Sequence, residues 1–215
     1  MNFLMFGAPM AGKGTLANLL AEEYKLPTIS MGELLRNTTN PMVKEYQARG
    51  EMVPMQIVLD VIKERLSQDD VKNGYILDGF PRTPEQLTAF VEQEIADINV
   101  VVNLEVPYET LLERVTGRRT CKECGYIYNT SWGLGYETCP KCGGEWGIRS
   151  DDNEETYKTR FDVYMKETLP ILEYFKKEGK VVTVQGQSEP EQSYQNMIDA
   201  FKTSEIAGLK EFIEG

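Results

Sequence analysis

Residues 2–15, which read NFLMFGAPMAGKGT, decide the fold. The apolar run at 2–6 ends at a glycine and predicts a buried parallel strand. The segment 7–13 has the spacing G-x-x-x-x-G-K, and apolar residues then recur at helical spacing over 16–24. A strand, a glycine-rich loop and a helix in this order predict a loop whose backbone N–H groups surround phosphate oxygens. Lys13 would add a positive charge beside those phosphates.

Strand-like and helix-like segments alternate along the rest of the chain. Further strands are predicted at 28–30, 75–77, 100–106 and 181–184. Helices are predicted at 31–66 with breaks near 40 and 50, at 84–95, 110–115 and 189–201, and at 151–178 with Pro170 inside. This alternation predicts an α/β fold with a five-stranded parallel sheet covered by helices on both faces. A glycine-rich segment at 117–149 predicts a small inserted β module.

Composition and charge exclude several classes of function. The chain has 215 residues, of which 41% are hydrophobic, so it can bury a core. Its formal net charge of −11 argues against nucleic acid as a partner, because phosphate backbones attract cationic surfaces. No apolar run reaches the roughly 18 residues of a membrane span, and the first residues lack a signal-peptide pattern, so we expect a cytoplasmic protein. Histidine is absent, which excludes chemistry that depends on it.

All four cysteines fall in two pairs, Cys121 with Cys124 and Cys139 with Cys142. In a reducing compartment this spacing favours a metal over disulfides. Four thiolates suit tetrahedral Zn²⁺, and a full set of protein ligands makes the site structural. Iron in the same cage and reduced thiols without metal remain as alternatives.

Asp78 ends the predicted strand at 75–77. Ligands of parallel α/β sheets bind at the carboxyl ends of the strands, where a carboxylate can hold Mg²⁺ through waters. Taken alone, an Asp-Gly pair is more simply a turn.

A longer motif changes that interpretation. Residues 76–82 read ILDGFPR and are followed by Gln86, which resembles the signature of adenylate kinases and related nucleoside monophosphate kinases. Five further segments resemble the same family, in family order and over nearly the whole chain: 7–15, 29–36, 50–54, 116–119 and 151–156.

The resemblance implies a domain organisation. A P-loop core would comprise residues 1–29, 54–116 and 153–215. An AMP-binding arm would occupy 30–53, and a zinc-binding lid 117–152.

The resemblance also assigns the site residues. Those implied for ATP are Met10, Ala11, Gly12, Lys13, Gly14, Thr15, Arg114, Arg118, Ile127, Tyr128 and Ser188. Those implied for AMP are Met31, Arg36, Glu51, Met52, Val53, Gly79, Phe80, Pro81, Arg82, Gln86, Arg149 and Arg160. The catalytic set would be Lys13, Arg82, Arg118, Arg149 and Arg160, with Asp78 organising the waters of Mg²⁺.

The implied reaction is Mg·ATP + AMP ⇌ 2 ADP in a monomer that also carries structural Zn²⁺. A phosphate acceptor is already anionic, so the transfer needs positioning and positive charge rather than a histidine base. Three alternatives remain: a kinase acting on CMP or UMP, a nucleotide-binding module without turnover, and a zinc-ribbon adaptor for nucleic acid.

Three methionines depart from the family pattern. Met10 stands where the loop usually has glycine, Met31 where the acceptor site has threonine, and Met55 where an acidic residue is usual. The stretch from Arg36 to Gly50 is also shorter than is typical. These departures bear on rate and base selectivity rather than on the fold.

Overall fold

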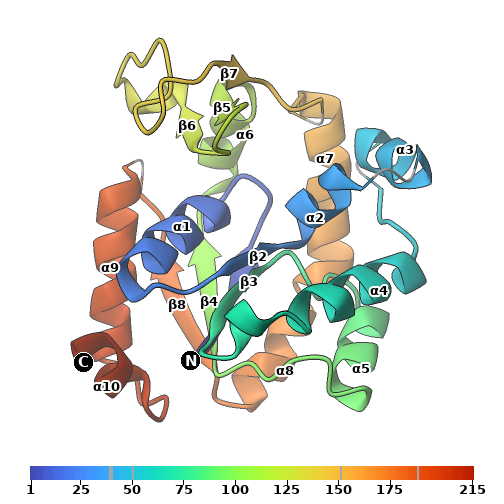
Figure 1. Ribbon diagram of the computed structural model, residues 1–215, viewed down its shortest axis with the longest axis vertical. Coiled ribbons are helices and arrows are strands. Elements are labelled where there is room, and N and C mark those ends of the chain that lie inside the picture. Colours follow the sequence, from blue (N-terminus) through green and yellow to red (C-terminus); the bar gives the residue numbers. More distant parts are fainter. Residues whose placement is uncertain (39–40, 50, 151, 188) are drawn as a thin grey trace.

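A computed structural model describes residues 1–38, 41–49, 51–150, 152–187 and 189–215. Its main sheet has five strands in the order β2-β3-β1-β4-β8, and every pairing is parallel (Figure 1). The strands are β1 (Asn2–Gly7), β2 (Thr28–Ser30), β3 (Tyr75–Asp78), β4 (Val100–Glu105) and β8 (Val181–Gln185). The predicted α/β fold and its five strands are confirmed.

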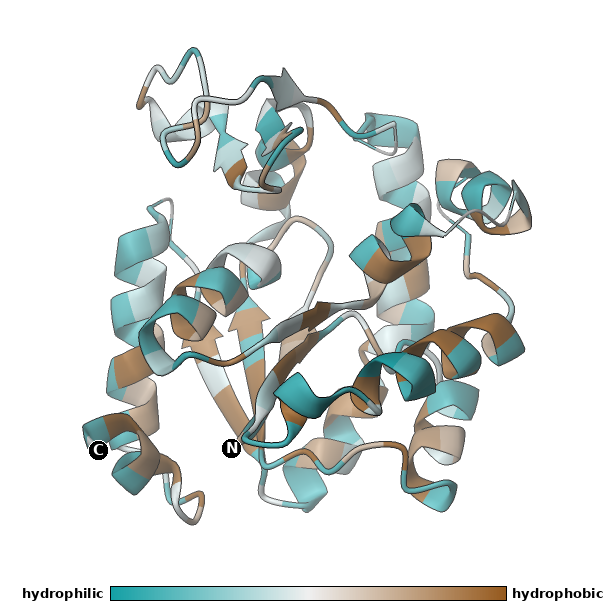
Figure 2. Ribbon diagram, in the orientation of Figure 1, coloured by the Kyte–Doolittle hydropathy of each residue, from teal (hydrophilic) through white to brown (hydrophobic). Residues whose placement is uncertain are grey.

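Both faces of this sheet are buried, because successive side chains of a strand point to opposite faces. In β1, Phe3 and Met5 join one apolar cluster, while Leu4 and Phe6 join the other. The apolar strands therefore lie between helices whose outer surfaces are polar (Figure 2). The first cluster includes side chains of α1 (Lys13–Tyr24), α6 (Tyr108–Gly117), α9 (Pro190–Lys202) and α10 (Leu209–Glu214). The second includes side chains of α4 (Met55–Leu66), α5 (Pro84–Glu92) and α8 (Ile171–Lys177).

The described residues of the predicted helical region at 31–66 form three helices. They are α2 (Met31–Asn37), α3 (Pro41–Arg49) and α4, followed by the short η1 (Asp69–Val71). Within the described ranges, no helix combines the length and apolar character needed to cross a bilayer.

A second, antiparallel sheet follows α6 at the end of the molecule far from both termini (Figure 1). Its strands are β5 (Arg118–Cys121), β6 (Ile127–Asn129) and β7 (Trp146–Gly147), with η2 (Thr130–Trp132) after β6. This segment, residues 118–147, is called the small-sheet module below. Its strands fall inside the segment that the sequence predicted as a β insertion.

Most of the segment 151–178, predicted as one long helix, is helical in the structure, but the helix is interrupted near Pro170. The structure has α7 (Glu154–Val163), then the π-helical turn η3 (Tyr164–Thr168), then α8. The amide of Leu169 donates to the carbonyl of Tyr164, five residues back, over 2.7 Å. Pro170 follows at once; it has no amide hydrogen, and its ring excludes the carbonyl of the preceding turn.

Helix α10 was not predicted from the sequence. It is only six residues long and is stabilised by tertiary contacts, since short helices are marginal alone. The ring of Phe212 lies 5.0 Å from that of Tyr24 and 5.6 Å from that of Phe3.

Candidate functional site

The loop between β1 and α1 brings the backbone close to the neighbouring strand. Gly7 has φ 141°, and a Cβ built there would lie 2.6 Å from the carbonyl oxygen of Leu104. Only glycine fits that approach. Gly12 caps α1 with φ 103° and has no side chain to satisfy the first amides of the helix. These amides, at the positive end of the helix dipole, form an anion site.

Lys13 lies at the centre of a group of charges. Its Nζ donates to the carbonyls of Gly7 (2.9 Å) and Ala8 (2.8 Å). Burial lowers the pKa of Lys13 to about 8; Asp78 opposes this shift, whereas Arg82 and two further arginines reinforce it. The low pKa therefore reflects mainly burial, which the negative charge of Asp78 does not offset.

This pKa predicts a pH dependence. Lys13 carries its proton below about pH 8 and is neutral above it, and only the charged form attracts phosphates. If a polyphosphate binds here, we expect kcat/KM for it to fall above about pH 8 along a one-proton limb. The limb for kcat should lie at higher pH, since bound phosphate raises the pKa of the lysine. A rate profile that is flat to pH 9.5 would contradict the assignment.

Two pockets open on this centre. The first, here called the loop pocket, lies between the β1–α1 loop and the small-sheet module. It is lined by Met10, Ala11, Gly12, Lys13, Gly14, Thr15, Asp78, Arg114, Arg118, Ile127 and Arg149 among others. The second, the arm pocket, is lined by Met31, Arg36, Glu51, Met52, Val53, Gly79, Phe80, Pro81, Arg82, Gln86 and Arg160 among others.

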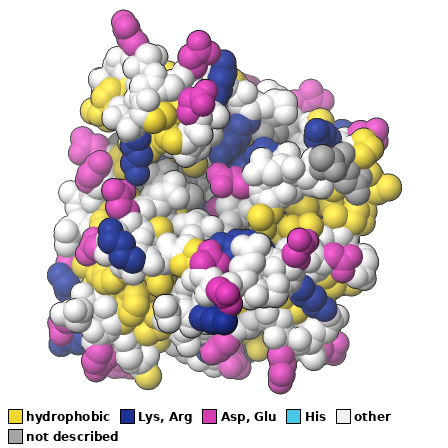
Figure 3. Space-filling model, viewed as in Figure 1, with side chains coloured by type: hydrophobic (Ala, Val, Ile, Leu, Met, Phe, Trp, Pro, Cys, Tyr) yellow, Lys and Arg dark blue, Asp and Glu magenta, His cyan; other side chains and the backbone are white. Residues whose placement is uncertain are grey.

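The two pockets share several of their cations. Lys13, Arg36, Arg82 and Arg160 line both. Lys and Arg side chains gather around the hollow beside the small-sheet module (Figure 3). An acidic chain has thus concentrated positive charge where two pockets meet, which favours two anionic ligands placed end to end.

Asp78 contributes the carboxylate at this junction. Its Oδ1 is buried and has no hydrogen-bond partner among the described residues. A buried carboxylate oxygen without a partner is costly unless a cation or water meets it. The residue therefore fits an Mg²⁺ held through waters.

Arg118, in the small-sheet module, and Arg149, two residues after its end, connect this part of the molecule to the rest of the chain. Arg118 makes a two-pronged ion pair with Asp152 through Nε (2.8 Å) and Nη2; the Asp152 side chain is buried and that of Arg118 is partly buried. Arg149 lies 3.8 Å from Glu33 of α2. Arg118 therefore links the small-sheet module to Asp152, and Arg149 links the segment after the module to α2.

Arg114 is buried and is held by backbone carbonyls. Its Nη1 donates to Ala11 (2.9 Å) and its Nη2 to Gln187 (2.7 Å). Burial lowers the pKa of Arg114, but an arginine stays protonated. One side chain thus joins the β1–α1 loop to the segment after β8.

Not every predicted site residue lies in a pocket. The side chain of Tyr128 is buried within the small-sheet module, against Trp132 (5.8 Å), Tyr136 and Trp146 (both 5.4 Å). Ser188 lies outside the described residues. Arg149 lines the loop pocket rather than the arm pocket.

The structure adds lining residues that sequence reasoning missed. Trp132 and Gln187 line the loop pocket, whereas Gln47 and Thr168 line the arm pocket. No spacing rule marks them, because they reach the pockets only through tertiary packing.

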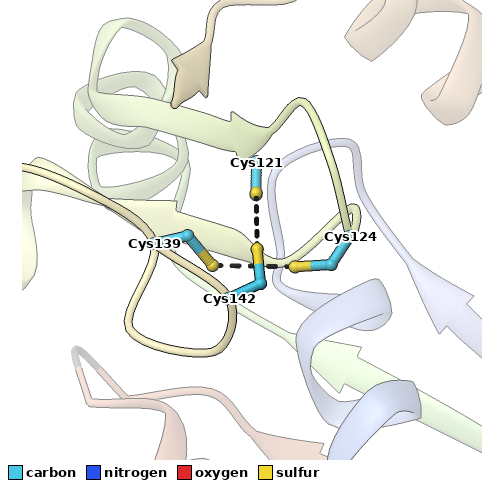
Figure 4. Close-up of side chains that lie close together, drawn as sticks. All are labelled: Cys121, Cys124, Cys139 and Cys142. Carbon is cyan, nitrogen blue, oxygen red and sulfur yellow. Dashed lines mark hydrogen bonds between the residues drawn. The ribbon is translucent and has the colours of Figure 1, made fainter. Parts of the chain in front are cut away.

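The four cysteines point toward one another (Figure 4). Their Sγ atoms all lie within 4.8 Å of one another, with Cys121–Cys142 at 3.5 Å and Cys124–Cys139 at 3.6 Å. A tetrahedral zinc with Zn–S bonds of about 2.3 Å separates its sulfurs by about 3.8 Å. The backbone of Cys124 lowers the pKa of Cys121, whereas hydrogen bonds with the other thiols raise the pKa of Cys142, so the cysteines share protons when no metal is bound. The set is compatible with zinc.

Comparison with known proteins decides the family. The adenylate kinase family model matches residues 5–180. The adenylate kinase of Thermodesulfovibrio yellowstonii is 45% identical over 198 residues, which are 86% of this chain and 92% of that protein. Those of Caldicellulosiruptor saccharolyticus (44% over 201 residues; 88% and 93%) and Archaeoglobus fulgidus (41% over 202 residues; 89% and 93%) are similar. The chain belongs to the adenylate kinase family.

Met10 departs from the glycine usual in this family, and the structure shows its cost. Met10 has φ 68°, a left-handed conformation that disfavours side chains by about 1–2 kcal/mol. In return, its side chain packs against the core cluster that contains Leu16. The strain thus lies in the loop of this adenylate kinase family member, where phosphates would bind.

We expect Met10→Gly to maintain or raise kcat/KM, because it relieves the left-handed strain and opens the loop. Met10→Ala is the matched control, since it removes the same side chain and keeps the strain. The comparison is made in steady-state kinetics of both variants. A large loss in the glycine variant alone would show that the loop is adapted to methionine.

Proposed function

We infer that this chain transfers the γ-phosphoryl group of ATP to the phosphate of AMP, reversibly, to form two ADP. The observation that carries the inference is the junction of the two pockets at Lys13, Arg82 and Arg160. A donor in one pocket and an acceptor in the other would present their phosphates to the same cations.

The chemistry needs no proton acceptor from the protein. The attacking oxygen of AMP is already anionic, and the transition state spreads negative charge over the transferred group. Catalysis then consists of alignment and of positive charge fixed in advance. A chain without histidine can supply both.

We assign the loop pocket to ATP. The amides of 10–15 and Lys13 would hold its phosphates, and Arg118 would reach them from the small-sheet module. Arg114 would lie against adenine, with the backbone near Ile127, Tyr128 and Ser188 beside the base. Asp78 would hold, through waters, the Mg²⁺ that is bound with ATP. This ion would neutralise part of the phosphate charge.

We assign the arm pocket to AMP. Arg36 and Arg82 would grip its phosphate, while Arg149 and Arg160 would bridge donor and acceptor. Gln86 would bind the adenine edge; its Oε1 accepts from the amide of Arg82 (2.8 Å), which fixes the orientation of its amide. The remaining contacts would come from Met31, from 51–53 and from 79–81.

We propose that residues 117–152 form a lid that excludes water, with zinc as a structural ion, and that 30–53 form an AMP-binding arm on a core of 1–29, 54–116 and 153–215. Exclusion of water prevents hydrolysis of ATP. We further propose a cytoplasmic monomer, since one chain supplies both pockets and free thiols suit a reducing compartment. Light scattering of the purified chain tests the monomer.

A coupled assay tests the function and the acceptor. With ATP as donor, we expect AMP to have the highest kcat/KM among AMP, GMP, CMP and UMP, because Gln86 would lose its partner with other bases. Met31 is buried and offers no hydroxyl, so discrimination should be weaker than in relatives with threonine. Equal values for CMP or UMP would leave a nucleoside monophosphate kinase but remove the adenylate assignment. Absence of transfer, with nucleotide binding intact, would favour a module without turnover.

A further inference from the structure

The backbone of Arg82 is held on both sides by side chains, one from the nearby Gln86 and one from the distant Thr168. Its amide donates to Gln86 Oε1 (2.8 Å), and its carbonyl accepts from Thr168 Oγ1 (2.8 Å). Its own Nε donates to the carbonyl of Gly79 (2.8 Å). These three bonds help to set where the Arg82 guanidinium lies at the junction of the pockets.

Thr168, the last residue of the π-helical turn, reaches Arg82. In a regular helix a threonine hydroxyl often bonds to the carbonyl four residues back. Thr159 does this on α7, donating to Glu155 over 3.3 Å. At the end of η3, the carbonyl of Tyr164 accepts from the amide of Leu169, and the hydroxyl of Thr168 bonds to Arg82, 86 residues away. Single π turns inside helices often mark functional sites.

The same turn lies just after the helix that carries Arg160. Thr168 and Tyr164 line the arm pocket with Arg82 and Arg160, and the ring of Tyr164 lies 6.2 Å from that of Phe6 in β1. The π-helical turn η3 thus contacts β1 and lies close to both Arg82 and Arg160.

We propose that Thr168 is a positioning residue of the phosphoryl transfer. Its hydroxyl fixes the backbone of Arg82 and thereby the guanidinium that meets the acceptor phosphate. The inference rests on the proposed function. This positioning role differs from a purely structural one because the effect of Thr168 on the rate depends on the side chain of Arg82.

Thr168→Val tests this with an isosteric side chain that cannot donate. We expect kcat/KM for AMP to fall about tenfold, because the variant leaves the carbonyl of Arg82 without its hydrogen-bond donor. KM for ATP should change by less than about twofold, because the bond supports the arm pocket. Thr168→Ser keeps the hydroxyl and should restore most of the loss. Thr159→Val on α7 is the matched control and should behave as the parent chain.

A double-mutant cycle with Arg82→Lys separates positioning from folding. If Thr168 acts through the guanidinium, Thr168→Val should lower kcat/KM for AMP much less in the Arg82→Lys background than in the parent chain. Equal costs in both backgrounds, or a lower melting temperature with unchanged kinetics, would overturn the proposal. The parent chain's own transfer to AMP tests the proposed function separately, so the two failures are distinguishable.

Discussion

Lys13→Met is expected to lower kcat by about a thousandfold, the loss typical of removing one fixed charge from a transition state. The ammonium lies among Asp78, Arg82 and Arg160, and its pKa of about 8 shows that the ligand-free site disfavours the charge. Phosphate would reverse that, because an anion in the loop pocket stabilises the protonated form. Steady-state kinetics at pH 7 give the measurement.

The fold should survive this change. The protonated lysine is disfavoured in the folded chain, so Lys13→Met should leave the melting temperature unchanged or raise it. Lys158→Met on the exposed side of α7 is the matched control and should retain parental kinetics. A Lys13→Met enzyme with a rate within about twofold of the parent would remove the lysine from the assigned role.

Cys139→Ser should produce the largest loss of stability. Cys139 is buried, and the small-sheet module otherwise has a core of a few aromatic rings around Tyr128. Such a small module depends on metal, because binding energy becomes folding energy. A loss of about 3 kcal/mol in the free energy of unfolding would lower the melting temperature by about 10 °C in a chain of this size. Calorimetry of the purified variant is the measurement.

Metal analysis and kinetics complete this test. The parent should hold about one zinc per chain. Leu134→Ser, at an exposed position of the same module, is the control and should melt like the parent. Below its melting temperature, Cys139→Ser should retain substantial activity, since four protein ligands leave no position for substrate. A metal-free chain of unchanged stability would contradict this, and so would a metal-depleted protein that stays folded, lid included, yet loses catalysis.

Local patterns in the sequence were enough to predict the main architecture. The apolar runs at 2–6, 75–77 and 100–106 had to be buried strands, since short apolar segments between breakers have few other places in a fold. The spacing of 7–13 placed an anion-binding loop between a strand and a helix. The paired cysteines predicted a four-thiolate cluster that the structure does assemble. Each of these signals lies within a few consecutive residues or depends on spacing alone.

The remaining features depend on contacts between distant segments, so only the tertiary structure decided them. The periodicity over 151–178 suits one helix, but the packing of Tyr164 and the bond from Thr168 to Arg82 accompany a π turn there. Helix α10 is too short to form without Phe3 and Tyr24 beneath Phe212.

The site shows the same division. The residue types at Lys13, Asp78 and Arg82 suggested phosphate chemistry, but the depressed pKa of Lys13 arises from burial and from arginines far away in the chain. The left-handed backbone of Met10 and the inward turn of Tyr128 are likewise properties of the folded chain. Sequence determines which groups are present and how the nearby backbone can bend. Folding alone sets the distances between remote side chains, and with them the electrostatic energies on which the transfer depends.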